Sequence, residues 1–188
     1  RVSRASIFAR TGLQFMGINT LYQLIAMREQ SSPLLDMAQS FLMIPDFFHW
    51  LLSGVKANEM TNASTTQFFN PTTRDWARDL LEEVGVPTHL LGPLVEPGTV
   101  LGPITQDVAA ATGLAGVRVI TPGTHDTASA VVAVPARSQA GAKPDWCYIS
   151  SGTWSLMGIE SPVPILNDAC RSLNFTNEGG IDHTSRVL

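Results

Sequence analysis

The chain has 188 residues and a formal net charge of −4, with 44% hydrophobic and only 15% charged residues. This length suits one domain or parts of two, and the apolar fraction is large enough to build a core. Because Lys and Arg form no cluster, and no uncharged apolar run approaches the ~20 residues that span a bilayer, we expect neither nucleic acid nor a membrane as a partner.

The ends and the cysteines indicate the context of the chain. It opens on Arg1 rather than Met, its first residues show neither a helix cap nor a strand start, and it stops at Leu188 without a tail. We therefore expect an internal fragment, whose apolar surface is covered in part by the remaining segments of the same longer protein. Cys147 and Cys170 stand in no metal-binding or redox spacing, and no signal-peptide pattern occurs, so free thiols and a cytoplasmic location are expected.

Caps and apolar residues predict helices in the first third of the chain. Asn19 or Thr20 caps the first helix, and Ser31-Ser-Pro33 starts a second with Pro in its first turn. Pro45-Asp46 begins a third helix, which ends at Gly54. The residues expected to face inward in the second helix are Leu34, Leu35 and Ala38.

Two stretches leave alternatives open. The apolar run 41–44 is either a buried strand or the end of the second helix, and its periodicity does not decide between them. The polar run 58–70 is either a solvated loop or the wall of a cleft for a ligand rich in hydroxyl groups.

Farther along the chain, a helix, two strands and a shorter helix are predicted. The helix opens at Asn70-Pro-Thr-Thr73, carries Trp76 on its apolar face and ends at Gly85. Residues 95–103 indicate two short strands about a Pro-Gly turn, and residues 105–112 indicate a brief helix.

A strand followed by a helix places a carboxylate at their junction. The β-branched residues of 117–120 predict a buried strand, which Pro122-Gly123 ends. The helix that starts at Thr124-His-Asp126 is small or apolar on every face, as in a helix that is buried all round. Asp126 can take the proton of an attacking hydroxyl group in phosphoryl transfer, or it can serve only as a helix cap, and both roles can coexist.

A turn of small residues beyond this carboxylate offers a place for phosphate. Residues 146–149 and 153–159 predict a hairpin. At its turn, Gly152 lets the backbone approach a phosphate closely, and Thr153 can donate its hydroxyl, although Ser-Gly-Thr alone is a common structural turn. Residues 137–144 are small and polar and contain Gly and Pro, so they predict a linker with a domain boundary.

Short motifs of small and polar residues are spaced along most of the chain. They are Ile18-Asn-Thr-Leu-Tyr-Gln-Leu24, Leu42-Met-Ile-Pro-Asp46, Thr61-Asn-Ala-Ser-Thr-Thr-Gln67, His125-Asp-Thr-Ala-Ser-Ala-Val131, Ile149-Ser-Ser-Gly-Thr-Trp-Ser-Leu-Met-Gly158 and Asn174-Phe-Thr-Asn-Glu-Gly-Gly180. In this order, the motifs resemble those of the FGGY carbohydrate kinases. The resemblance implies an α/β fold of the ribonuclease-H-like, actin and hexokinase type, with the active site between two lobes. It also implies that residues 1–138 are the C-terminal part of the N-terminal kinase domain and that residues 145–188 begin the C-terminal kinase domain.

The same resemblance implies an ATP-dependent ketose kinase, with L-rhamnulose as the expected substrate and a fuculose- or xylulose-type ketose as the alternative. Asp126 is then the general base, near the Mg²⁺ that bridges the phosphates of ATP. The resemblance further implies that His125, Asp126 and Thr127 contact the sugar, and that Gly152 and Thr153 contact the phosphates. Because many relatives carry Gln after the Asp, Thr127 favours the rhamnulose type.

A non-catalytic fragment is the alternative from a different functional class. The family's first phosphate-binding loop and its adenine-binding glycine segment are not found in this sequence. Because catalysis by positioning needs both, we expect the chain alone to be nearly inactive. The motif Asn177-Glu-Gly-Gly180 is expected to form a flexible turn without a catalytic role, and Trp154 is expected to pack rather than to bind a ligand.

Overall fold

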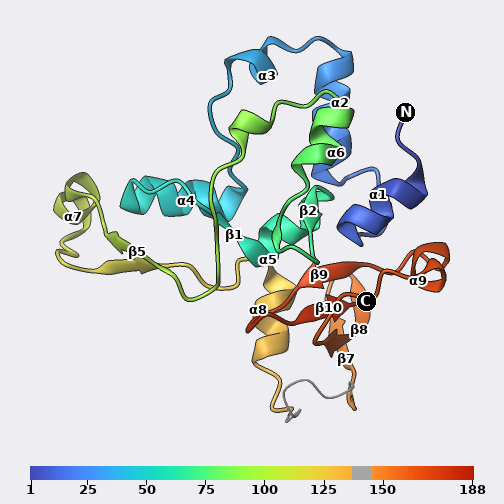
Figure 1. Cartoon of the computed structure of the whole chain (residues 1–188). Coiled ribbons are helices and arrows are strands. Elements are labelled where there is room, and N and C mark those ends of the chain that lie inside the picture. Colours follow the sequence, from blue (N-terminus) through green and yellow to red (C-terminus); the bar gives the residue numbers. More distant parts are fainter. Residues whose placement is uncertain (137–144) are drawn as a thin grey trace.

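The computed structural model describes residues 1–136 and 145–188. Helices dominate the first part of the chain and a four-stranded sheet the last part, with α8 (Asp126–Val132) beside that sheet (Figure 1). The predicted linker at 137–144, with the domain boundary placed in it, lies outside the described residues. No helix among the described residues is long and apolar enough to cross a bilayer. Cys147 and Cys170 are free thiols, as predicted.

The first helices largely follow the predicted pattern. The elements α2 (Thr20–Glu29), α3 (Pro33–Met37) and α4 (Ile44–Ser53) confirm the three predicted helices. Leu34 is wrongly predicted to face inward: it is 63% exposed, and only Leu35 of α3 is buried, because this short helix turns a single residue toward the core.

The expectation that the first residues hold no helix cap is wrong, because the helix α1 (Arg4–Thr11) begins there. The side chain of Ser3 accepts a hydrogen bond from the Ser6 N–H at 3.1 Å, and Gly12 ends the helix in the left-handed conformation. Residues 41–44 form neither a buried strand nor the end of the second helix, the two structures predicted for them. Phe41 makes an isolated bridge to Leu91, and Ile44 already belongs to α4.

Residues 58–83 alternate short strands with short helices. The order is β1 (Asn58–Glu59), α5 (Met60–Ala63), the 3₁₀ turn η1 (Ser64–Thr66), β2 (Phe69–Asn70), β3 (Asp75–Trp76) and α6 (Arg78–Glu83). The helix predicted from residue 70 therefore begins only at Arg78. Residues 71–74 instead form the turn that lets β2 and β3 pair antiparallel, with Arg74 at a φ of 56°.

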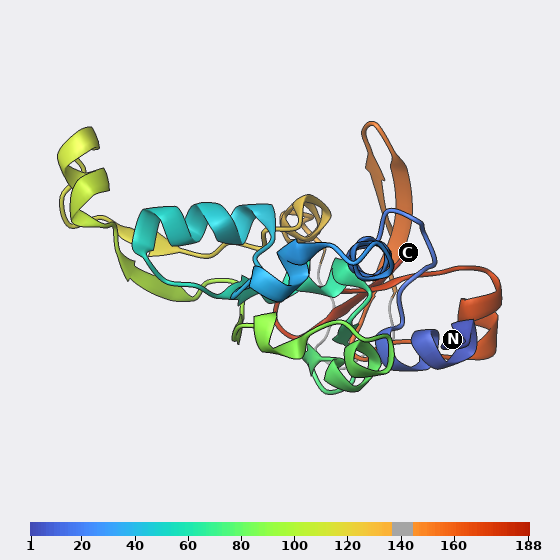
Figure 2. The same ribbon diagram turned by 90° about the horizontal axis from the view of Figure 1, so that it is seen from above.

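The middle of the chain forms an arm, made of α4, β5 (Val100–Pro103), α7 (Gln106–Thr112) and β6 (Arg118–Ile120), which extends to one side in Figure 2. The two predicted strands about the Pro-Gly turn form as β4 (Leu94–Val95) and β5. They do not pair with each other, because β4 lies parallel to β1 and β5 lies antiparallel to β6. The predicted helix α7 is confirmed, and η2 (Thr88–Leu90) is a single 3₁₀ turn.

The prediction of a buried strand before Asp126 is wrong. In β6 only Val119 is buried, because a two-stranded ribbon covers one face of each strand and leaves alternate residues exposed. The prediction that α8 is buried all round is also wrong, since Val132 is 58% exposed. The helix buries only the face that carries Thr127, Ala128 and Val131.

The apolar core lies among the helices of the first part. Its buried members are Ile7, Leu21, Ala63, Phe68, Trp76, Ala77, Leu80, Leu81, Val86 and Leu91. Phe68 is at the centre, with its ring centroid 5.5 Å from those of Phe41 and Trp76. Each large side chain buried in this way contributes roughly 1.5–3 kcal/mol to folding.

The last part of the chain forms an antiparallel sheet in the order β7-β8-β10-β9, flanked by α9 (Asp168–Ser172). The predicted hairpin is confirmed as β7 (Tyr148–Ser151) and β8 (Ser155–Ser161), and it projects away from β9 (Asn177–Gly179) and β10 (Ser185–Val187) in Figure 2. The flexible turn predicted at residues 177–180 is wrong: residues 177–179 form a buried strand, because β10 pairs with them.

The strand β9 also joins the sheet to the first part of the chain. The Asn177 N–H donates to the Gly12 carbonyl at 2.9 Å, and its side-chain amide donates to the same carbonyl at 3.0 Å. The Gly179 N–H donates to Ser64 Oγ at 2.8 Å. The sheet is therefore held against α1 and α5 by directed hydrogen bonds, and this junction contains the candidate site.

Candidate functional site

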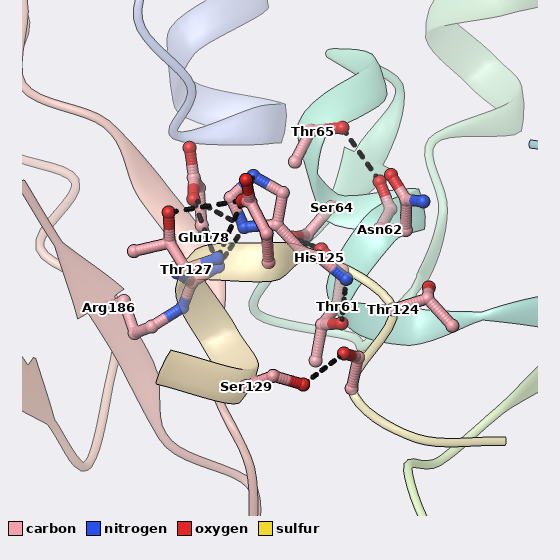
Figure 3. Close-up of polar contacts among 12 residues, drawn as sticks. Thr61, Asn62, Ser64, Thr65, Thr124, His125, Thr127, Ser129, Glu178 and Arg186 are labelled. Atoms are coloured by element: carbon pink, nitrogen blue, oxygen red, sulfur yellow. Dashed lines mark hydrogen bonds and ion pairs between the residues drawn. The ribbon is translucent and has the colours of Figure 1, made fainter. Parts of the chain in front are cut away.

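A polar layer lies where α5, α8 and the sheet meet. We use this name for Glu59, Thr61, Ser64, Thr124, His125, Glu178 and Arg186. Figure 3 shows the members other than Glu59 around His125, with Glu178 and Arg186 on one side of it and Thr61 and Ser64 on the other. The layer therefore assembles residues from segments that are far apart in the sequence.

Glu59 anchors the backbone just before His125. It is 0% exposed, and as the N-cap of α5 its carboxylate accepts hydrogen bonds from the Thr61 N–H at 2.8 Å and the Asn62 N–H at 3.3 Å. The same carboxylate accepts from the Thr124 N–H at 2.9 Å and the Thr124 hydroxyl at 2.7 Å. Glu59 thus fixes the start of α5 and the approach to α8 with a single side chain.

The burial of the residues around Glu59 excludes one of the two structures predicted for residues 58–70. A solvated loop is wrong, because Asn58, Thr61 and Gln67 are fully buried together with their neighbours. Most of these side chains hydrogen-bond to backbone, as when Gln67 donates to the Leu13 carbonyl at 3.3 Å. The remaining alternative, a cleft wall, stays a prediction.

His125 is the N-cap residue of α8 and is mostly buried. Its Nδ1 lies 2.9 Å from Arg186 Nη2 and 3.5 Å from Glu178 Oε2. Burial lowers the pKa of His125, since it penalises the cation. Among the nearby charges, Glu178 raises this pKa, Arg186 lowers it, and Asp126 and Glu59 raise it.

Asp126 begins α8 and points to solvent. Its side chain is 96% exposed, and Oδ1 accepts hydrogen bonds from the Thr127 N–H at 2.6 Å and the Thr127 hydroxyl at 3.3 Å. The Nε2 of His125 is 3.7 Å from the same oxygen. The carboxylate is accordingly accessible, with one oxygen oriented by its neighbours, which suits a group that accepts a proton from a ligand.

A cavity of about 370 Å³ lies next to His125, within the size range of small-molecule sites. It is lined by Leu13, Gln14, Met16, Ile18, Asn19, Thr20, Gln23, Met43, Thr65, His125 and Glu178. Amide, hydroxyl and imidazole groups can bind hydroxyl groups of a ligand, while the Met, Leu and Ile side chains form an apolar wall. Asp126 and Thr127 are not among the lining residues, although Asp126 directly follows His125.

The other predicted site residues, Gly152 and Thr153, lie at the exposed tip of the β7–β8 hairpin. The Gly152 N–H donates to the Trp154 carbonyl at 2.9 Å, so in this conformation it closes the turn. Trp154 is exposed, contrary to the packing role predicted for it. The strand β7 lies against the C-terminal half of α8, where Val131 and Tyr148 line a shared pocket, whereas Asp126 is at the opposite end of that helix. The phosphate-binding role of the tip remains a prediction.

The described residues contain no group of three or more His, Cys, Asp or Glu side chains that could hold a metal ion. This does not conflict with Mg²⁺ bound together with ATP, because Mg²⁺ is commonly held by substrate phosphates and only one or two carboxylates.

No site role was predicted for three charged residues of the polar layer, Glu59, Glu178 and Arg186, although Glu178 lies in the motif that was expected to form a flexible turn. Glu59 has a local signal, because an acidic residue before Thr61-Asn62 can cap a helix. Glu178 and Arg186 have none, because their burial depends on the pairing of β9 with β10 and on the docking of that pair against α8.

Comparison with known proteins is consistent with this architecture. Residues 1–133 match the FGGY family of carbohydrate kinases, N-terminal domain. The chain is 43% identical over 188 residues to the rhamnulokinase of Oceanobacillus iheyensis and 46% identical over 187 residues to that of Pectobacterium atrosepticum. It is covered completely in both comparisons but spans only 38% and 36% of the length of these curated relatives.

Solved structures of sugar kinases share the fold. A xylulose kinase from Rhodospirillum rubrum superposes with a TM-score of 0.80 at 18% identity, covering 100% of this chain and 37% of its own. Plasmodium falciparum glycerol kinase with ADP gives a TM-score of 0.79 at 13% identity, with 100% of this chain and 37% of its own covered. These superpositions confirm the predicted actin- and hexokinase-type α/β fold. With residues 1–133 matching the family's N-terminal domain, the chain belongs to the FGGY family of carbohydrate kinases.

Proposed function

We propose that the kinase to which this chain belongs transfers the γ-phosphoryl group of ATP to the 1-hydroxyl of L-rhamnulose. The observation that carries this proposal is the identity of 43% over the whole chain with a protein named rhamnulokinase. We further propose that residues 1–138 complete the N-terminal kinase domain and that residues 145–188 begin the C-terminal one. The remaining segments of the kinase are then the partners of this chain, and the activity belongs to the whole protein.

The cavity beside His125 is the proposed sugar site. Its amide and hydroxyl side chains are suited to the sugar hydroxyls, and its apolar wall of Met16, Ile18 and Met43 is suited to the methyl group of a 6-deoxy sugar. His125 contributes a ring nitrogen from the α8 side. In this proposal Thr127 supports the sugar site through Asp126, whose Oδ1 it holds at 2.6 Å through its N–H.

Asp126 is the proposed general base. As the sugar's 1-hydroxyl oxygen attacks the γ-phosphorus, its proton passes to the Asp126 carboxylate, and the bond from phosphorus to the ADP oxygen breaks. Bound ATP with Mg²⁺ supplies the phosphoryl group and neutralises charge on the phosphates. Gly152 and Thr153 are proposed to hold phosphate oxygens through their backbone and hydroxyl groups, which requires the turn at Gly152 to open its internal hydrogen bond.

The substrate is tested by coupled measurement of ADP release with the full-length kinase. We expect the highest kcat/KM with L-rhamnulose and lower values with L-fuculose, L-xylulose and glycerol. A higher value with one of the other ketoses would assign the protein to a different FGGY activity. Titration calorimetry of Mg-ATP against the 188-residue chain alone is expected to show no tight binding, and tight binding would contradict the inactive-fragment alternative.

The general base is tested by Asp126→Asn. We expect kcat to fall roughly 10²–10⁴-fold with KM little changed, because the amide cannot accept the proton. Asp107→Asn is the matched control, since Asp107 also lies in the first turn of a helix, α7 on the arm. Full activity of Asp126→Asn would remove Asp126 from the reaction.

A further inference from the structure

We propose that Arg186 is a positioning residue that fixes His125 as a neutral imidazole with its proton on Nε2, so that His125 offers an N–H donor to the sugar cavity and to Asp126. The consequence for the sugar rests on the proposed function, whereas the tautomer itself does not.

The geometry around Arg186 determines which nitrogen carries the proton. Arg186 on β10 is 0% exposed; its Nε donates to the Gly179 carbonyl at 3.1 Å, and its Nη2 lies 3.0 Å from Glu178 Oε2 and 2.9 Å from His125 Nδ1. A guanidinium has only donors and stays charged at all relevant pH values. The Nδ1 that faces it must therefore accept, and a neutral imidazole then has its N–H at Nε2.

The charges facing His125 act in opposite directions. They are Arg186 on β10, Glu178 on β9, Asp126 on α8 and Glu59 on β1. The Glu178 carboxylate, 3.5 Å from Nδ1, would attract a proton to that nitrogen, but it already accepts a hydrogen bond from Arg186. Without the guanidinium, the three carboxylates would favour protonation of Nδ1 and a cationic ring.

The state of the ring matters for the site because Nε2 is the ring nitrogen that Arg186 does not engage. His125 lines the cavity, and its Nδ1 is already engaged by Arg186. With a proton on Nε2, the ring donates toward a sugar oxygen and faces the Asp126 carboxylate, 3.7 Å away, with its positive end. With the proton on Nδ1 instead, Nε2 would present a lone pair to that carboxylate and compete with it for the sugar's hydroxyl proton.

A contribution to folding stability does not by itself explain why a charged Arg186 side chain is buried. Its Nη1 is buried without a hydrogen-bond partner among the described residues, and a buried donor without a partner is costly. Burying an ion pair such as Arg186 and Glu178 commonly stabilises a fold no better than well-packed apolar residues do. A role in setting the hydrogen-bond direction at His125 accounts for a full guanidinium at this buried position.

The test is nuclear magnetic resonance of the protein carrying ¹⁵N-labelled histidine, with His125 assigned from the spectrum of His125→Gln. We expect the Nε2–H tautomer and a pKa below the ordinary histidine value. In Arg186→Gln the pKa of His125 should rise, because the positive charge that opposes Glu178, Asp126 and Glu59 is removed while burial still lowers the pKa. In Glu178→Gln it should fall further while the tautomer is kept. Arg171→Gln, which removes only an exposed ion pair on α9, is the control and should leave His125 unchanged.

An Nδ1–H tautomer in the unmodified protein would overturn the proposal, and so would an unchanged pKa in a folded Arg186→Gln. If Arg186→Gln does not fold, the tautomer and the pKa of His125 in the unmodified protein and in Glu178→Gln still test the proposal, since both proteins keep the guanidinium. In the coupled assay, Arg186→Gln should lower kcat about 10–100-fold and shift the pH profile, and Arg186→Lys, which keeps the charge, should restore part of both. The Nε2–H tautomer without rhamnulose phosphorylation would refute only the proposed function, and phosphorylation with an Nδ1–H tautomer would refute only the role of Arg186.

Discussion

The apolar core around Phe68 and the polar layer around Glu59 are both buried, but different interactions hold them. The core is stabilised by removing apolar surface from water. This stabilisation is non-directional, so it depends on how well the side chains fill the volume and tolerates substitutions that conserve that volume. The stability of the polar layer depends on the direction of its hydrogen bonds, since an unpaired buried polar group is costly. The comparison teaches that the apolar core determines whether the chain folds, while the polar layer determines how His125 and Asp126 are positioned.

The largest effect is expected from opening a void in the apolar core. Phe68 is fully buried between Phe41 and Trp76, so Phe68→Ala should lower the free energy of unfolding by about 3–5 kcal/mol. Urea denaturation followed by circular dichroism measures this, with the exposed Phe48→Ala as control. A loss below about 1 kcal/mol would show that the core repacks around the void.

A pH-dependent effect is expected at Asp46, a buried carboxylate at the edge of the polar layer. Burial raises its pKa to about 6, against the opposing hydrogen bonds from the Glu59 N–H and Asn58, and with a smaller contribution from the Glu59 charge. Because the folded state holds this proton more tightly than the unfolded state, stability falls as pH rises between about 4 and 6, and the loss is complete above that window.

Asp46→Asn should abolish this loss. Relative to the unmodified protein, the variant should gain on the order of 3 kcal/mol between pH 4 and pH 7, because each pKa unit corresponds to about 1.4 kcal/mol. The Oδ1 of Asn58 is buried without a partner among the described residues, so after an amide flip it can accept from the new amide. Denaturation curves at several pH values measure the gain, and Asp36→Asn controls for losing a first-turn carboxylate. Parallel pH dependences of variant and unmodified protein would contradict the expectation.

A smaller effect on stability, but one that reaches the site, is expected for Glu59→Gln. The amide keeps one acceptor oxygen and turns a donor toward another donor, so the free energy of unfolding should fall by about 2 kcal/mol. Because Thr124 loses its anchor, sugar affinity of the full-length kinase should fall as well. Phe68→Ala, in contrast, should leave the affinity of the folded fraction unchanged. Glu82→Gln on the exposed face of α6 is the control. Unaltered sugar affinity in Glu59→Gln would show that the hydrogen bonds from Thr124 to Glu59 do not position the sugar site.

The smallest effect is expected for Ser64→Ala. Its hydroxyl accepts from the Gly179 N–H at 2.8 Å and donates to the Thr61 carbonyl at 2.6 Å, so its removal should cost about 1 kcal/mol. Hydrogen exchange should report the change as faster exchange of the Gly179 amide. Ser172→Ala, which removes an exposed hydroxyl on α9, should leave that amide protected.

The same contrast explains what could be predicted from the sequence. The helices α2, α4 and α7 were predictable because residues typical of helix ends, such as Asn19, Gly54 and Thr105, are local signals. The motif around Asp126 could be located for the same reason. The pairing of β4 with β1 could not be predicted, nor could the burial of Glu178 and Arg186, because both depend on contacts between distant segments.

The origin of the polar layer in distant segments also has a kinetic consequence. Glu59 binds Thr124 across 65 positions of the chain, and Arg186 meets His125 across 61. Closing such long loops costs conformational entropy before the contact forms, whereas the hydrogen bonds within a helix close only short loops. During refolding, the signal of helix formation should therefore precede the protection of the Thr124 and His125 amides, and ligand binding should be the last property to return.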